Sequence, residues 1–220
     1  MLFIFAILFY KERTVFVDIA YHMFHILRTG DFAIQNYRFV AGITQLFPLV
    51  GSKLSLSLGT ISVLYSAGFI LYYFGCYIIC GAVLKNYRFA LVLLCFNILF
   101  VSESYYWMQS ELPQGAAMML VVLSYISNRN IKDMHPAAIV LIIAALAAFA
   151  FAYAMLLFPF IYTLLFLALR NEPPPSRKLL IITGALYFTA ILLKNLFFKT
   201  QYDSEAMAHG QNLARLFPHY

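Results

Sequence analysis

Charged side chains are scarce in this sequence. Asp, Glu, Lys and Arg together make up 11% of its 220 residues, whereas about 25% is usual in a soluble globular domain. This shortfall, with a hydrophobic content of 63%, excludes an ordinary water-soluble domain and indicates an integral membrane protein. The net charge of +6 then reflects Lys and Arg in short cytoplasmic loops, and we expect no nucleic-acid partner.

Cysteine is almost absent as well. Cys76, Cys80 and Cys95 lie in apolar stretches and form no CxxC pair, which argues against a disulfide framework and a cysteine zinc site. The sequence also shows no Gly-rich phosphate loop, no Ser/His/Asp nucleophile motif and no internal repeat. We therefore expect no enzyme that depends on one of those motifs.

Apolar residues, in contrast, form long runs, which predict an all-α, polytopic transmembrane helix bundle. A helix needs about 20 residues to cross the hydrocarbon layer. The run at 54–84 predicts one span and so does 179–198, whereas 137–169 is too long for one span and short for two. The runs cover residues 1–10, 54–84, 89–101, 113–127, 137–169 and 179–198.

Loop charge resolves the ambiguous runs, because Lys and Arg are retained on the cytoplasmic side of a membrane. Basic residues gather in three loops, at Lys85 and Arg88, at Arg129 and Lys132, and at Arg170, Arg177 and Lys178. If all three loops are cytoplasmic, residues 89–127 and 137–169 each form a hairpin of two short helices. With two single spans and a short first helix, residues 1–220 then form one domain of about seven helices in a plasma or inner membrane.

This topology places residues 11–53 and the C-terminal tail on the outer face. The first ten residues are too few for a full span, and the polar tail offers no further helix to close the bundle. We therefore expect the chain to be a fragment that is incomplete at one or both ends.

The first outer loop predicts two amphipathic helices, at 15–29 and 34–47, that lie flat in the membrane interface. Each has one apolar and one polar face at 100° per residue, and such helices lie along a membrane surface. Gly30 fits the C-cap of the first helix and Asp31 the N-cap of the second, and Pro48 is expected to follow the end of the second.

One side of the first predicted helix carries groups that could perform chemistry. Asp18, His22 and His25 are spaced at i, i+4 and i+7, which aligns a carboxylate and two imidazoles. Asp18 could act as a general base, and His22 and His25 could hold a divalent metal ion. The alternative is that all three simply belong to the polar face of an amphipathic helix, which contacts water and lipid head groups.

Two arginines face the same aqueous side. The guanidinium groups of Arg28 and Arg38 have the shape to bind a phosphate, although attraction to anionic lipid head groups would explain them equally well.

A second outer stretch, SESYYWMQSELP, combines Glu103 and Glu111 with Tyr and Trp rings. Carboxylates beside aromatic rings suit a sugar ligand, and an interfacial aromatic belt is the alternative. The outer tail adds Asp203 as a further candidate ligand-binding acid.

Taken together, these patterns resemble the GT-C membrane glycosyltransferases. The likeness is carried mostly by VDIAYHMFHILRTGDFAIQNYRFVAGITQLFPL, which has an Asp shortly after the first helix and an Arg and a Gln before a Pro, and also by YWMQSELP and TQYDSEAMAHGQN. The resemblance implies transfer of a sugar from a polyprenyl-phosphate donor to a lipid, glycan or protein on the outer face.

By position, the resemblance makes Asp18 the catalytic base and adds Gln45 to the substrate-binding residues. Ile19 follows Asp18, so the paired acidic motif of some members is missing. Two other functions fit the residues: a glycolipid transporter or flippase, which needs the same binding groups but no base, and a non-catalytic membrane scaffold subunit.

Overall fold

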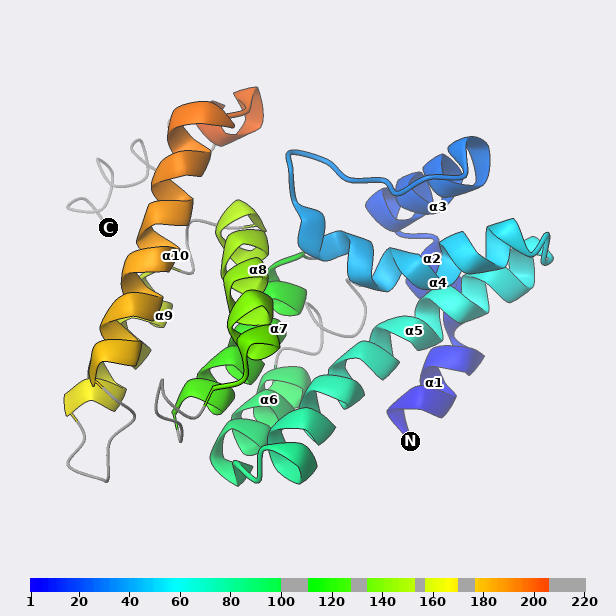
Figure 1. Cartoon of the computed structure of the whole chain (residues 1–220). Coiled ribbons are helices and arrows are strands. Elements are labelled where there is room, and N and C mark those ends of the chain that lie inside the picture. The colour runs from blue at the N-terminus through cyan, green and yellow to red at the C-terminus, as the bar shows by residue number, and fades with distance from the viewer. Residues whose placement is uncertain (100–110, 128–133, 153–156, 170–176, 206–220) are drawn as a thin grey trace, which may run out of the picture.

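The computed structural model describes residues 1–99, 111–127, 134–152, 157–169 and 177–205, and within them the fold is all-α (Figure 1). Its elements are α1 (Leu2–Leu8), α2 (Tyr10–Thr14), α3 (Val17–Thr29), the 3₁₀ turn η1 (Phe39–Ala41), α4 (Gly42–Lys53), α5 (Leu58–Ile78), the π-helical turn η2 (Ile79–Val83), α6 (Tyr87–Leu99), α7 (Glu111–Ile126), α8 (Pro136–Ala152), α9 (Leu157–Leu169) and α10 (Arg177–Phe197).

In the described part of the chain, two helices are long and apolar enough to cross a membrane, Leu58–Val83 and Arg177–Phe197. They correspond to the single spans predicted at 54–84 and 179–198. The predicted hairpin regions each contain two shorter helices, α6 and α7 in the first and α8 and α9 in the second. Helix pairs are therefore present where the basic loops predicted them, while their passage through a membrane stays a prediction.

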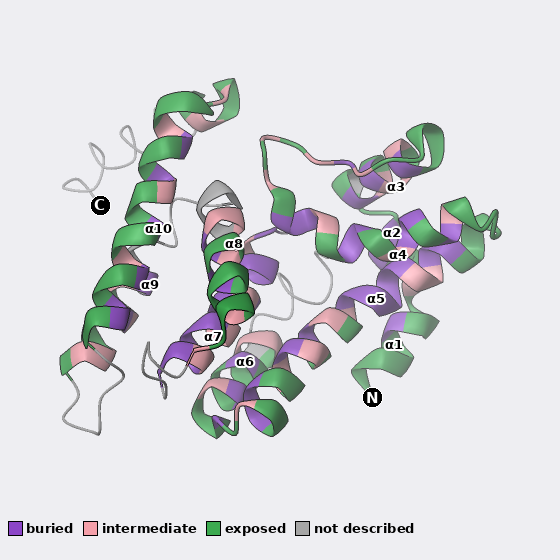
Figure 2. Ribbon diagram, in the orientation of Figure 1, coloured by how far each residue is buried: buried purple, intermediate pink, exposed green. Residues whose placement is uncertain are grey.

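Apolar side chains form two main core clusters. One is formed by α7, α8, α9 and α10 and includes Leu146, Phe160 and Tyr187. The other joins α3, α5, α6 and α7 and includes Ile19 and Phe69. Many apolar side chains on the outward faces of α1 and α10 remain exposed (Figure 2), as expected for helices that meet hydrocarbon instead of water.

Helices α1 and α2 are both bonded to Ser66 of α5, α2 through the fully buried Arg13. The Nη1 of Arg13 donates to the carbonyl of Ser66 at 3.0 Å and to its Oγ at 2.8 Å. The Ser66 hydroxyl in turn donates to the carbonyl of Ala6 at 2.7 Å. This chain of bonds turns the N-terminal segment back onto α5 and so positions the start of α3.

Of the two predicted loop helices, the first is present as α3, while its position in the membrane interface stays a prediction. It ends where expected, because Gly30 adopts the left-handed conformation (φ 69°) and its N–H bonds to the carbonyl of Ile26. Asp31 does not cap a second helix, since its Oδ1 accepts from the neighbouring N–H of Phe32 in an extended segment. In Figure 1 α3 lies across the direction of α10.

The second predicted helix was misplaced. Asn36 and Tyr37 have positive φ angles of 50° and 60°, which break a helix at the position where one was expected, so the helical backbone begins only at η1. At the other end Pro48 lies inside α4. The helix continues through it because the following turn packs against α5, where Gly51 leaves room for Ile61.

Close packing of α4 on α5 also depends on a glycine at position 68. A Cβ there would collide with the ring of Phe47. We expect Gly68→Ala to destabilise the protein by about 1–3 kcal/mol, the usual cost of overpacking, as measured by thermal unfolding in detergent. Gly75→Ala on the same helix is the matched control: a Cβ at position 75 meets no atom within 4 Å, so stability should hold or rise. Equal losses would contradict this packing.

Candidate functional site

The N-terminus of α7 and the segment before η1 are joined by a buried ion pair. Arg38 Nη1 lies 3.4 Å from Glu111 Oε2, and the two side chains are 12% and 6% exposed. Glu111 is the first residue of α7, where the helix dipole favours a negative charge. The pair links positions 73 residues apart, so one acidic and one basic residue named from separate motifs meet in one place.

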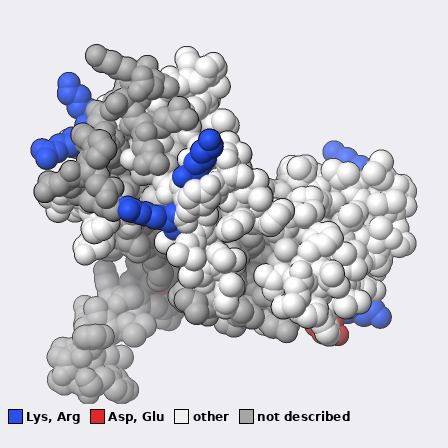
Figure 3. Space-filling view, turned by 90° about the horizontal axis from the view of Figure 1, so that it is seen from below, with Lys and Arg blue, Asp and Glu red and all other residues white. Residues whose placement is uncertain are grey.

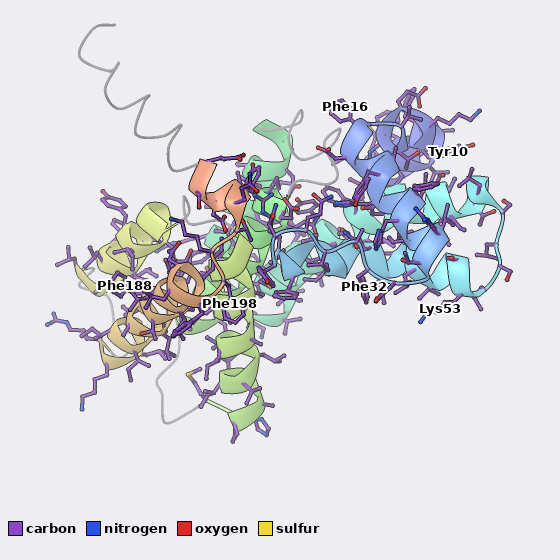
Figure 4. All side chains as sticks on the ribbon, turned by 90° about the horizontal axis from the view of Figure 1, so that it is seen from above. Tyr10, Phe16, Phe32, Lys53, Phe188 and Phe198 are labelled. Carbon is purple, nitrogen blue, oxygen red and sulfur yellow. The ribbon has the colours of Figure 1, made fainter. Side chains whose placement is uncertain are left out.

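The chain after α10 covers this ion pair. The Tyr202 ring lies 4.8 Å from the guanidinium carbon of Arg38, a distance suited to a cation–π interaction. Beside it, the rings of Tyr37 and Phe198 meet edge to face at 5.5 Å. Figure 4, seen from above, labels Phe198, which directly follows α10. The N-terminal loop and the C-terminal segment therefore build the site together.

Asp203 is held by bonds of its own. Thr200 and Asp203 form a reciprocal capping box, in which the Thr200 N–H donates to Oδ2 at 3.2 Å and the Asp203 N–H donates to Thr200 Oγ1 at 3.2 Å. Lys194 donates to Oδ1 at 3.1 Å. Burial disfavours the charged carboxylate, but the bonds from Thr200 and Lys194 outweigh it and lower the pKa of Asp203 below its usual value.

Gln45 is completely buried and bonds α4 to His22 of α3 and to the backbone of Ala33. Its Oε1 accepts from the Ala33 N–H at 2.8 Å, and its Nε2 donates to the Ala33 carbonyl at 3.1 Å and to Nδ1 of His22 at 3.2 Å. All these bonds are internal, so the contacts favour a structural role for Gln45 over the predicted contact with substrate.

Asp18 is exposed in the first turn of α3, one turn before buried His22. Its charge raises the pKa of both His22 and Glu111, so Asp18 lies within electrostatic range of the Arg38–Glu111 pair. The next residue, Ile19, is fully buried in the core formed with α5 and α7 and so fixes this end of α3. The structure therefore holds an accessible carboxylate within electrostatic range of an ion pair that contains a buried guanidinium.

Two other predicted residues, Arg28 and His25, are not part of this group. Arg28 lies exposed in the last turn of α3, about 15 Å along the helix axis from Asp18, where it complements the helix dipole. Glu103 lies outside the described residues. His25 is partly buried on α3, and in the described part of the chain no three His, Cys, Asp or Glu side chains gather closely enough to hold a metal ion.

Sequence reasoning missed several side chains that build the site. Thr44 donates to Gln114 Oε1 at 3.1 Å, and Tyr72 donates to the Gln114 carbonyl at 2.7 Å, which joins α4, α5 and α7 behind Glu111. Tyr202 and Lys194 were also missed as partners of the predicted residues. One local signal was available: the T-x-x-D spacing of Thr200 and Asp203 is typical of a capping box, which fixes the position of the Asp203 side chain.

Burial makes His22 a source of acid sensitivity. Burial, opposed by the charge of Asp18 and assisted by that of His25, lowers the pKa of His22 to about 4. The imidazole is therefore neutral at pH 7, and Nδ1 accepts the bond from Gln45. Protonation at Nδ1 would break that bond and place a charge in the core.

We expect the free energy of unfolding to fall by up to about 3 kcal/mol between pH 6.5 and 4 because of His22. In that range the unfolded chain binds the proton and the folded chain does not, so stability is lost as the pH falls. Thermal unfolding in detergent at a series of pH values measures this loss. His22→Gln should remove most of it, and His25→Gln should keep it. An unchanged pH dependence in His22→Gln would contradict the assignment.

Comparison with known proteins gives no relative for this site. No protein-family model, no curated protein and no solved structure matches the chain. A function has to be inferred from the residues and their geometry.

Proposed function

We propose that the protein is a membrane glycosyltransferase that moves a sugar from a polyprenyl-phosphate donor to an acceptor on the outer face of the membrane. The observation that carries this proposal is that exposed Asp18 lies within electrostatic range of the buried Arg38–Glu111 ion pair. A carboxylate that water can reach and a guanidinium nearby are the two groups that such a transfer requires.

The chemistry follows from those two groups. The acceptor hydroxyl attacks the anomeric carbon of the sugar and forms the new C–O bond, while its proton passes to Asp18. The bond from the anomeric carbon to the phosphate oxygen breaks, and the lipid phosphate leaves with the electron pair. Arg38 stabilises that negative charge, since a guanidinium has five N–H donors and can hold a carboxylate and a phosphate together.

The arrangement of charge supports an outer location for this site. Lys85 lies between η2 and α6, Arg88 is in the first turn of α6, and Arg177 and Lys178 begin α10. The η2–α6 junction and the start of α10 are at the lower end of the bundle in Figure 1. Seen from below, Lys and Arg side chains stand on an otherwise largely uncharged surface (Figure 3). With this basic end on the cytoplasmic side, the end that carries Asp18 faces outward, in a chain that crosses the membrane several times.

The proposal is tested with membranes that contain the protein and a panel of radiolabelled polyprenyl-phosphate hexoses and pentoses. Transfer of the label to a new product supports the transferase. Movement of the intact lipid between leaflets without transfer would instead support a flippase. If the label is neither transferred nor moved between leaflets, the result would support a scaffold subunit and contradict the proposal.

A further inference from the structure

The segment 198–205, which directly follows α10, covers Arg38 with an aromatic ring. The Tyr202 ring lies 4.8 Å from the guanidinium carbon, and the Arg38 side chain is 12% exposed. At the start of the segment, the Phe198 ring meets that of Tyr37, the residue before Arg38, at 5.5 Å. A phosphate has to reach the N–H groups of a guanidinium to bind it, so the segment restricts access to Arg38.

Hydrogen bonds hold the segment on α10. Lys194 of α10 donates to Asp203 Oδ1 at 3.1 Å, and Thr200 exchanges hydrogen bonds with Asp203. The Phe198 N–H donates to the Lys194 carbonyl at 2.8 Å. The hydrogen bonds that the structure describes for this segment all run within it or to α10. These bonds keep Tyr202 at a fixed place at the end of α10.

Across the junction with Arg38, the contacts that the structure describes are aromatic instead. They are the cation–π contact of Tyr202 and the edge-to-face contact of Phe198 with Tyr37. The Tyr202 and Phe198 side chains stay partly exposed, at 47% and 42%, and a cation–π contact is weak where water reaches it. The segment can therefore part from Arg38 at these rings while its bonds to α10 persist.

We propose that residues 198–205 form a lid that opens and closes over Arg38 and so controls entry of the donor phosphate. This inference rests on the proposed function, because it takes Arg38 as the phosphate site. A lid suits a transfer reaction, since closure keeps out water, which competes with the acceptor hydroxyl for the sugar. Tyr202 closes the lid, and the bonds of Thr200 and Asp203 hold Tyr202 in place.

The first test measures how fast phenylglyoxal modifies three arginines of the full chain in nanodiscs, by mass spectrometry. Exposed Arg28 reports on the reagent, and fully buried Arg13 reports on unfolding. Tyr202→Ala should raise the rate at Arg38 about fivefold, as loss of one cation–π contact allows, with Arg13 and Arg28 unchanged. Tyr202→Phe keeps the ring and should match the unaltered chain. An unchanged rate at Arg38, or an equal rise at Arg13, would overturn the lid.

A second variant loosens the lid without touching Arg38. Thr200→Val removes the hydroxyl that bonds to Asp203, whereas Gln201→Ala removes only the exposed bond to Glu205. Thr200→Val should raise the rate at Arg38 several-fold, and Gln201→Ala should leave it unchanged. Equal rates in the two variants would show that the bonds of Thr200 do not hold the segment over Arg38.

A reversible cross-link tests whether the lid opens. The Tyr37 and Phe198 rings are 5.5 Å apart, so cysteines at both positions can be joined by a short bifunctional methanethiosulfonate, with exposed Cys95 replaced by Ser. The cross-linked protein should react at Arg38 several-fold more slowly than the same variant after reduction. Equal rates would show that the segment does not open, and the inference would be wrong.

Polyprenyl phosphate added to the reduced protein links the lid to the proposed function. It should slow modification of Arg38 several-fold, and polyprenol, which has no phosphate, should not. If the cross-link slows modification but polyprenyl phosphate does not, the lid stands and the phosphate site of the proposed function is wrong. The rates with and without the cross-link need neither donor nor sugar transfer, so the two ideas can fail separately.

Discussion

Asp18→Asn is expected to reduce sugar transfer by about 10²–10⁴-fold, the usual contribution of a general base. The amide keeps the size of the side chain but cannot accept the proton of the acceptor hydroxyl. Because Asp18 is exposed, its replacement should leave the fold and the affinity for the donor nearly unchanged. The rate of transfer and the donor KM, measured on the full protein in membranes, separate these two expectations.

Asp31→Asn provides the matched control. Asp31 is also exposed, lies in the same loop and bonds only locally to the N–H of Phe32, so its variant should keep near-normal turnover. If Asp18→Asn also keeps near-normal turnover, the base lies elsewhere, and Glu103, Glu111 and Asp203 are the acids to replace next. If none of them matters, the transferase loses its chemical basis.

Arg38→Ala is expected to weaken donor binding by about 10–100-fold, the range for hydrogen bonds to a charged group. It also leaves the buried carboxylate of Glu111 without its partner, which costs about 3–5 kcal/mol of stability. The donor KM and thermal unfolding in detergent measure the two effects. A single variant would confuse them, since a poorly folded protein also binds poorly.

The double variant Arg38→Ala, Glu111→Gln separates binding from folding. Removing the unpaired charge should restore much of the stability while donor binding stays weak. Arg28→Ala, at the exposed far end of α3, should change neither quantity. If the double variant regains normal donor affinity, Arg38 serves the fold alone and the phosphate is bound elsewhere.

Local signals in the sequence were sufficient for much of the fold. The apolar runs anticipated α5 to α10, and Gly30 fixed the end of α3 because only a left-handed residue continues the chain there. The error at α4 has a local cause too. Apolar periodicity cannot reveal the positive φ angles at Asn36 and Tyr37, and Pro48 was read as a helix end without knowledge of the packing on α5.

The site was anticipated in its residues more than in its contacts. Asp18, Arg38, Glu111 and Asp203 were named from separate motifs, but no pattern paired Arg38 with Glu111 or placed Tyr202 over the guanidinium. Such contacts join residues far apart in the chain and arise only when the helices pack. The same is true of Gln45, whose polar side chain looked available for substrate until packing enclosed it.

The most direct test of the central claim is the side of the membrane on which the donor is consumed. Sealed vesicles of known orientation, carrying the full protein, receive a radiolabelled polyprenyl-phosphate sugar in one leaflet only. The account predicts transfer from the leaflet that corresponds to the outer face, and its loss in Asp18→Asn. Transfer only from the cytoplasmic leaflet, or equal transfer by the Asp18→Asn variant, would contradict it.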